Sequence, residues 1–197
     1  MNEKRVYTFG NGQAEGNASM REVLGGKGAN LAEMNHIGVP VPPGFTITTD
    51  TCNEYYKVGQ EKIVELLTDE VNAAVAHTEA LMNCKFGDPK NPLLVSVRSG
   101  ARASMPGMMD TILNLGLNDE VAAGMVEKTG NPHFVYDSYR RFVQMYGDVV
   151  LGMKPENKED IDPFEAIIEK VKEEQGVVLD KDLSVESLKK LVELFKK

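Results

Sequence analysis

A glycine-rich turn carrying one lysine is the first candidate for chemistry in this sequence. Residues 24–30 read Leu-Gly-Gly-Lys-Gly-Ala-Asn, which places Lys27 just before an expected helix. Glycine turns expose backbone N–H groups and a helix N-terminus adds partial positive charge, so both favour a phosphate beside the lysine. The turn is not a P-loop, because Lys27 is followed by Gly28 and not by serine or threonine. By itself it also fits an ordinary turn, since glycine serves any left-handed position.

A strand that leads into an arginine-containing loop is the second candidate. Residues 93–97 favour a buried strand, and the loop of small residues that follows carries Arg98 and Arg102 but no acid. Arginine offers a fixed fork of donors suited to phosphate oxygens, and Gly100 and Gly107 would let the backbone approach a ligand. We therefore predict a local anion site here. The alternative is a surface loop in which Arg98 pairs with a carboxylate and the methionines of the loop only fill the edge of a core.

Metal and redox chemistry find no support in the residue pattern. The three histidines, His36, His77 and His133, are not clustered with acids or cysteines, so each is expected to be structural or exposed. Cys52 and Cys84 form no Cys-x-x-Cys pair. The sequence thus offers hydrogen-bond donors that could bind phosphate, but no set of Mg²⁺ ligands. Phosphoryl transfer nevertheless requires a metal ion to neutralise the phosphates.

The overall composition limits the classes of partner. The 197 residues are 42% hydrophobic and 26% charged, as in an ordinary globular protein. Acids outnumber bases by 30 to 22, which gives a net charge of -8 and disfavours general binding to nucleic acid or to an anionic membrane. No signal-like N-terminus and no run of about 18 apolar residues occurs. We therefore predict a soluble, cytoplasmic protein with no nucleic-acid or membrane partner.

Short strands and helices are expected to position the two candidate segments within residues 1–115. β-prone runs separated by glycine and proline indicate strands at 6–9, 45–48 and 93–97. Apolar spacing predicts helices at 29–36, from a cap at Thr49 or Asp50 to residue 56, and at 60–82. This part is predicted to mix helix and strand, with Lys27 at a helix start and Arg98 at a strand end.

Residues 116–197 are predicted to form a separate, all-helical subdomain. Asn118 is expected to cap a helix that Gly130 closes, and a second helix is predicted at about 132–150. Asp162 followed by proline indicates the start of a third helix, and Ser184 the cap of a fourth. The predicted fold class is α+β, with domains at 1–115 and 116–197.

Several of these segments resemble a known family. Residues 15–21, 25–34 and 38–45 look like the opening of the pyruvate, phosphate dikinase and phosphoenolpyruvate synthase family. Residues 98–119 resemble the dikinase branch, because the synthases typically continue after the arginine with a Ser-Ser-Ala-Thr-Ala-Glu-Asp type of segment. The resemblance continues through residues 136–142 and is weaker at 57–85 and 150–197.

The resemblance implies a fold and a set of site residues. The fold is the first lobe of an ATP-grasp domain with a mixed sheet, followed by a helical subdomain. Lys27 corresponds to a lysine that contacts ATP phosphates, and Arg98 to the catalytic arginine that stabilises the transferring phosphoryl group and also binds the nucleotide. Gly107 and Met109 lie in the loop that closes over the phosphates. Ser99 and Arg102 are further candidates for ATP contacts.

The resemblance also implies that this chain is the N-terminal nucleotide-binding fragment of a longer enzyme. Such an enzyme converts ATP, phosphate and pyruvate to AMP, diphosphate and phosphoenolpyruvate through a phosphohistidine on another domain. The Mg²⁺ ligands are expected outside this chain, the fragment alone is expected to be inactive, and the full-length enzyme is expected to be a homo-oligomer. The alternatives are a fragment of a phosphoenolpyruvate synthase or related dikinase, and a non-catalytic anion-binding module.

Overall fold

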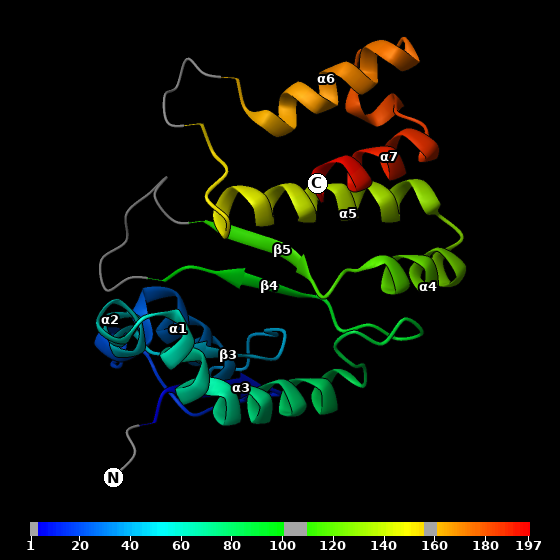
Figure 1. The fold of residues 1–197 in the computed structure, drawn as a ribbon. Helices are drawn as coiled ribbons and strands as arrows, with labels where there is room; N and C mark the ends of the chain where they lie inside the picture. The colour runs from blue at the N-terminus through cyan, green and yellow to red at the C-terminus, as the bar shows by residue number, and fades with distance from the viewer. Residues whose placement is uncertain (1–3, 101–109, 156–160) are drawn as a thin grey trace. The chain divides into compact units, whose positions relative to one another are not determined.

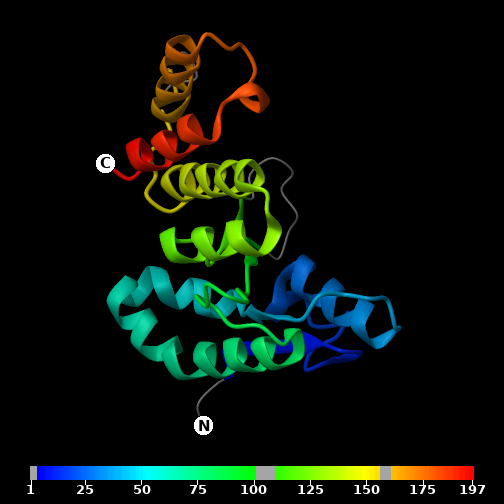
Figure 2. The same cartoon turned by 90° about the vertical axis from the view of Figure 1, so that its right-hand side faces the viewer.

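The computed structural model describes residues 4–100, 110–155 and 161–197. The chain divides into two units (Figures 1 and 2). The first contains the described residues up to Cys84 together with Ser99 and Gly100, and the second contains Lys85–Arg98 and the described residues from Asp110 to Lys197. Each unit has its own sheet and helices.

An antiparallel sheet of three strands forms the centre of the first unit. Strand β1 (Val6–Gly10) lies in the middle, between β2 (Gln13–Ala14) and β3 (Gly44–Ile47). The turn between β1 and β2 uses left-handed backbone at Asn11 (φ 52°) and Gly12 (φ 75°). Such a turn suits asparagine and glycine, and it reverses the chain so that β2 pairs antiparallel with β1.

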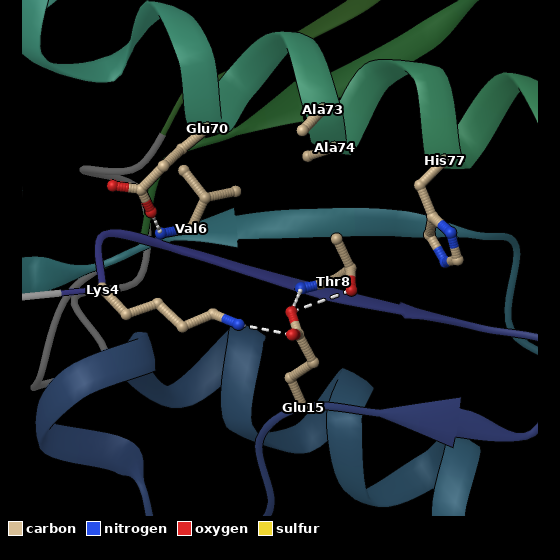
Figure 3. Close-up of a pocket in the computed structure, with 8 residues that line it drawn as sticks. All are labelled: Lys4, Val6, Thr8, Glu15, Glu70, Ala73, Ala74 and His77. Atoms are coloured by element: carbon tan, nitrogen blue, oxygen red, sulfur yellow. Dashed lines mark hydrogen bonds and ion pairs between the residues drawn. The ribbon is translucent and has the colours of Figure 1, made fainter.

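Three helices complete this unit: α1 (Arg21–His36), α2 (Thr49–Val58) and α3 (Gln60–Met82). Helix α3 packs on the face of β1 that carries Val6 and Thr8 (Figure 3). Because side chains alternate along a strand, Tyr7 and its partner Thr46 lie on the other face. The sheet therefore separates α3 from α1, which packs on Thr46.

The second unit begins with a β-hairpin that packs on a helix. Strand β4 (Val95–Arg98) pairs antiparallel with β5 (Thr111–Leu115), with a bulge between Val95 and Val97. Ile112 of β5 is buried with Leu117, Val135 and other residues of the helices that follow. Strand β5 is thereby fixed against α5 (Pro132–Val149).

The remaining helices stack beside α5. These are α4 (Asp119–Thr129), α6 (Pro163–Gln175), the short 3-10 turn η1 (Asp180–Asp182) and α7 (Val185–Phe195). Helix α7 lies between α5 and α6 (Figures 1 and 2). Their apolar stripes form a core centred on residues that are fully or almost fully buried, among them Ile168, Leu183, Leu188 and Leu191.

The predicted helix boundaries in this unit are confirmed at their caps. The side chain of Asn118 accepts a hydrogen bond from the amide of Val121, and Asp162 accepts hydrogen bonds from two amides of α6. Ser184 caps α7, and Gly130 and Gly176 are left-handed at the ends of α4 and α6. The sequence placed these ends correctly because a cap depends on local residue types.

Several expectations need correction. Within both sheets of the described residues the strand pairings are antiparallel, so the expected mixed sheet is not seen there. Strand β4 is mostly exposed, with Val97 47% accessible, and so it is not the buried strand that its composition suggested. Helix α1 starts at Arg21 and not near Ala29, because it continues across an internal glycine break. Thr48, and not Thr49 or Asp50, caps α2.

The boundaries of the two units do not coincide with the expected division at residue 115. The second unit includes the β4–β5 hairpin as well as the helices, because β5 packs on α5. Residues 111–115, for which no strand was predicted, form strand β5. Among the described residues, no helix is both long and apolar enough to cross a membrane.

Candidate functional site

The glycine turn is built as a break inside helix α1. Gly25 has φ 67° and ψ 169°, outside the helical region, while the residues on both sides remain helical. Gly59 adopts almost the same conformation (φ 81°, ψ 173°) where α2 gives way to α3. Because only glycine adopts this backbone without strain, Gly25 ends one helical turn and starts a second helical segment. The amides that follow Gly25 are therefore the first amides of a helix.

The next two glycines have different surroundings. A side chain at Gly26 would meet no other atom within 4 Å, so the surface over this amide is open. A Cβ at Gly28 would lie 2.7 Å from Cγ2 of Thr46 and 2.9 Å from its hydroxyl oxygen. Gly28 is thus required for α1 to lie directly on β3, whereas Gly26 leaves room for a ligand.

Lys27 extends from this second segment to the chain that follows β4. Its ammonium group donates a hydrogen bond of 2.8 Å to the backbone carbonyl oxygen of Ser99, which lies in the same unit. Two of the predicted site residues, Lys27 and Ser99, are therefore in contact. Lys27 as a whole is half-buried, and the hydrogen bond of its ammonium group lies at an exposed position.

Arg98 is the last residue of β4 and belongs to the second unit. It pairs across the hairpin with Thr111, and its side chain is exposed. No carboxylate of the described residues forms an ion pair with it, so the alternative of a structural ion pair has no support there. Strand pairing holds the backbone of Arg98 while its guanidinium remains available for a ligand.

Three further candidates cannot be placed. Arg102, Gly107 and Met109 lie outside the residues that the structure describes. Their predicted contacts with a nucleotide remain predictions from sequence resemblance.

An open cavity of about 580 Å³ lies between β1 and α3 (Figure 3), and residues 24–30 are not among those that line it. Its charged walls are already paired: Glu15 accepts hydrogen bonds from Lys4 and from both the amide and the hydroxyl of Thr8. Glu70 accepts hydrogen bonds from the amides of Arg5 and Val6. Burial alone would raise the pKa of Glu15, but these donors lower it below its ordinary value. We interpret the cavity as a structural crevice whose carboxylates hold the start of β1.

The histidines have no metal-binding arrangement. His36 and His133 contact the backbone carbonyl oxygens of Gly16 and Leu183, at 2.8 and 2.9 Å. His77 is exposed and lines the cavity of Figure 3. Within the described ranges, no group of three or more histidine, cysteine or acidic side chains could hold a metal ion.

Taken together, the first unit offers an ammonium group and the first amides of a helix, and the second offers a guanidinium. These groups can bind and stabilise negative charge, and none is placed as a nucleophile or a general base. Sequence reasoning missed the role of Thr46 beneath Gly28 and of β5 beside Arg98. The β-prone run Thr111-Ile-Leu was the available signal for β5, and it is followed by left-handed Asn114 and Gly116.

Comparisons with known proteins identify the family of the chain. Residues 21–175 match the family described as pyruvate phosphate dikinase, AMP/ATP-binding domain. The pyruvate, phosphate dikinase of Clostridium symbiosum is 56% identical over 193 residues, which are 98% of this chain and 21% of that protein. The chloroplastic dikinases of Flaveria trinervia and Zea mays are 52% and 50% identical over 194 residues, 98% of this chain and 20% of each.

The chain spans about a fifth of the length of these relatives. The matched residues contain the glycine turn with Lys27 and the strand end with Arg98. The chain therefore belongs to the pyruvate, phosphate dikinase family, within which it corresponds to the AMP/ATP-binding domain.

Proposed function

We propose that this chain holds ATP for a pyruvate, phosphate dikinase and forms part of the N-terminal ATP-grasp domain of that enzyme. The complete enzyme would convert ATP, phosphate and pyruvate to AMP, diphosphate and phosphoenolpyruvate, with a histidine of another domain of the same polypeptide as phosphoryl carrier. The observation that carries the proposal is the position of Lys27, at the start of a glycine-broken helical segment within the matched AMP/ATP-binding domain.

In this proposal Lys27 and Arg98 have different tasks. The Lys27 ammonium and the amides after Gly25 bind the phosphate chain of ATP, for which a helix N-terminus is suited. The Arg98 guanidinium stabilises the charge on the phosphoryl group as it is transferred, which a planar fork of donors does well. Gly107 and Met109 would contribute contacts from the loop between β4 and β5, with Ser99 and Arg102 as additional candidates.

The other parts of the reaction are assigned to chain beyond these residues. The described residues lack a group that could hold a metal ion, so we place the Mg²⁺ ligands elsewhere in the polypeptide and derive no step through the ion here. The length of the relatives leaves about four-fifths of such an enzyme for the metal ligands, the carrier histidine and the pyruvate site. We further propose a cytoplasmic homo-oligomer.

Replacement of Arg98 by alanine tests the proposed division of labour. In a complete dikinase that carries this chain as its matching segment, hereafter the complete enzyme, Arg98→Ala should lower ATP-dependent phosphorylation of the carrier histidine about 100-fold or more. Transfer from the phosphohistidine to pyruvate should change less than about threefold, because that step does not use this site. Both half-reactions can be followed with labelled ATP and labelled phosphoenolpyruvate.

A second arginine of the same unit provides the control. Arg141→Ala removes an exposed guanidinium, 62% accessible, and should leave both half-reactions near the wild-type rate. Equal losses in the two half-reactions of Arg98→Ala would contradict the proposal, because they would mean that Arg98 supports the protein as a whole and not the ATP step.

A further inference from the structure

The junction between β3 and α2 contacts the Lys27 turn on both sides of its glycine break. On one side, the hydroxyl group of Thr49 donates a hydrogen bond to the carbonyl oxygen of Glu22. On the other side, the side chain of Thr46 lies directly beneath Gly28. Both threonines belong to the first unit and come from four consecutive residues of the chain.

The contact to Glu22 holds the helical turn that precedes the break. In a continuous helix each carbonyl accepts a hydrogen bond from the amide four residues later, and a non-helical residue interrupts this pattern. Glu22 lies in the helical turn that ends at Gly25, and Thr49 supplies a donor from outside α1. The donor is itself fixed, because Thr49 is the first residue of α2, whose cap Thr48 accepts a hydrogen bond from the amide of Thr51.

The contact beneath Gly28 fixes the second helical segment. Thr46 is held in the sheet opposite Tyr7 of the central strand. A single added carbon at Gly28 would lie 2.7 Å from Thr46, which is closer than side-chain carbons normally approach. Gly28 and Thr46 thus set the height of the segment above the sheet. Lys27 directly precedes Gly28, so its backbone lies in the same helical segment and is held at the same height.

We propose that Thr49 and Thr46 are positioning residues that fix the Lys27 ammonium for its contact with the phosphates of ATP. This inference rests on the proposed function, because it assigns the threonines an effect on nucleotide binding through Lys27. Neither threonine needs to touch the nucleotide. Thr49 contacts the segment before the break and Thr46 contacts the segment after it, so the loss of either should let Lys27 move away from its phosphate-binding position.

The test compares three variants in the complete enzyme. Thr49→Val keeps the shape of the side chain but removes its donor, whereas Thr49→Ser keeps the donor. Thr68→Val is the matched control, because the Thr68 hydroxyl also donates to a helix carbonyl, that of Val64 at 2.7 Å, on α3 of the same unit. The readouts are kcat and KM for ATP in phosphorylation of the carrier histidine, the rate of the pyruvate half-reaction, and the thermal midpoint.

We expect the KM for ATP to rise roughly 3- to 10-fold in Thr49→Val, the range that loss of one hydrogen bond produces. Thr49→Ser and Thr68→Val should stay within about twofold of wild type, and the pyruvate half-reaction should not change. Should Thr49→Val fail to fold, Thr46→Ser offers a second route, because it removes only the methyl group beneath Gly28. It should also raise the KM for ATP selectively.

A double-mutant cycle separates this inference from the proposed function. In a Lys27→Met background, Thr49→Val should raise the KM for ATP much less than it does in the wild-type background, because the main residue through which it acts is gone. An unchanged KM in Thr49→Val or Thr46→Ser, while Lys27→Met is strongly impaired, would overturn the inference and leave the proposed function intact. Lack of an effect of Lys27→Met would overturn both, and a Thr49→Val effect that stays undiminished without Lys27 would overturn the positioning role alone.

Discussion

Asp148, near the end of α5, is a carboxylate in an unfavourable environment. Its Oδ1 atom is buried and has no hydrogen-bond partner among the residues that the structure describes. Burial raises the pKa of Asp148, and the nearby negative charges of Asp162 and Glu165 raise it further, against the opposing effect of Lys154. A raised pKa means that the folded state disfavours the charged form, so the carboxylate costs stability at neutral pH.

We therefore predict that Asp148→Asn stabilises the protein at pH 7, by up to about 1 kcal/mol in the free energy of unfolding. The gain should be present above the unfolded-state pKa of about 4 and should disappear below it, where Asp148 is protonated in both states. Thermal unfolding of both proteins between pH 7 and pH 3 measures this. An Asn variant that is less stable at pH 7 would contradict the prediction.

Single residues differ in how much of their role the sequence reveals. Lys27 and Arg98 could be selected because the charge and the neighbouring glycines of each are visible in the sequence. The partner of Lys27 is a backbone carbonyl, that of Ser99, which every residue possesses and which therefore leaves no signal in side-chain type. The same holds for Thr49, whose acceptor is the carbonyl of Glu22 in another helix.

At the scale of elements, a buried arginine joins α5 to η1. The side chain of Arg140 is only 5% exposed, and it donates to Asp137 on its own helix and to Asp180 at 2.9 and 3.0 Å. Lys172 of α6 approaches the same Asp180 at 3.4 Å. Hydrogen bonds to Glu169 and Asp180 raise the pKa of Lys172 above its ordinary value although burial opposes them. These charges connect three consecutive parts of the second unit.

Replacement of Arg140 by methionine should therefore destabilise the second unit strongly. Removing Arg140 leaves the two carboxylates with fewer hydrogen-bond donors. We expect the free energy of unfolding to fall by about 2 to 4 kcal/mol, and the lower end applies because Asp180 is partly exposed. Arg141→Met is the control, because Arg141 pairs with the same Asp137 but is 62% exposed, and it should cost less than about 1 kcal/mol. Chemical unfolding followed by circular dichroism measures the stability of both variants. Equal losses of stability in Arg140→Met and Arg141→Met would contradict the role of Arg140 as the buried link.

Elements were predictable where their signals are local. The limits of α4 to α7 follow from caps and from glycines or prolines at their ends, and α3 was predicted with the correct bounds. Strand β5 was missed because the sequence before it is rich in small residues and its pairing with β4 joins residues about 15 positions apart. Likewise, the exposure of β4 depends on how the hairpin packs, which its apolar composition does not determine.

At the scale of the whole molecule, long-range organisation was the hardest feature to predict. The sequence indicates an α+β fold, but a mixed sheet was expected where the strands pair antiparallel. The expected boundary at residue 115 marks a change of composition, whereas the units are defined by contacts that join Lys85–Arg98 to the later helices. The family could be predicted, because its short motifs keep their order along the chain.

The difference in length between this chain and its relatives bears most directly on function. The chain spans about a fifth of its relatives, and Lys27 and Arg98 reside in different units within that fifth. We assign the phosphate contacts to this chain, and the metal ligands, carrier histidine and pyruvate site to the remainder of the enzyme. The glycine-broken helix α1 then holds ATP through Lys27.

Phosphorylation of the carrier histidine by labelled ATP tests this role of Lys27. The measurement compares the complete enzyme with its Lys27→Met and Lys57→Met variants, the second removing an exposed lysine at the end of α2. We predict that Lys27→Met lowers kcat/KM for ATP at least about tenfold, because a charge-assisted phosphate contact is lost, while Lys57→Met is unchanged. Equal rates for Lys27→Met and Lys57→Met would contradict the account.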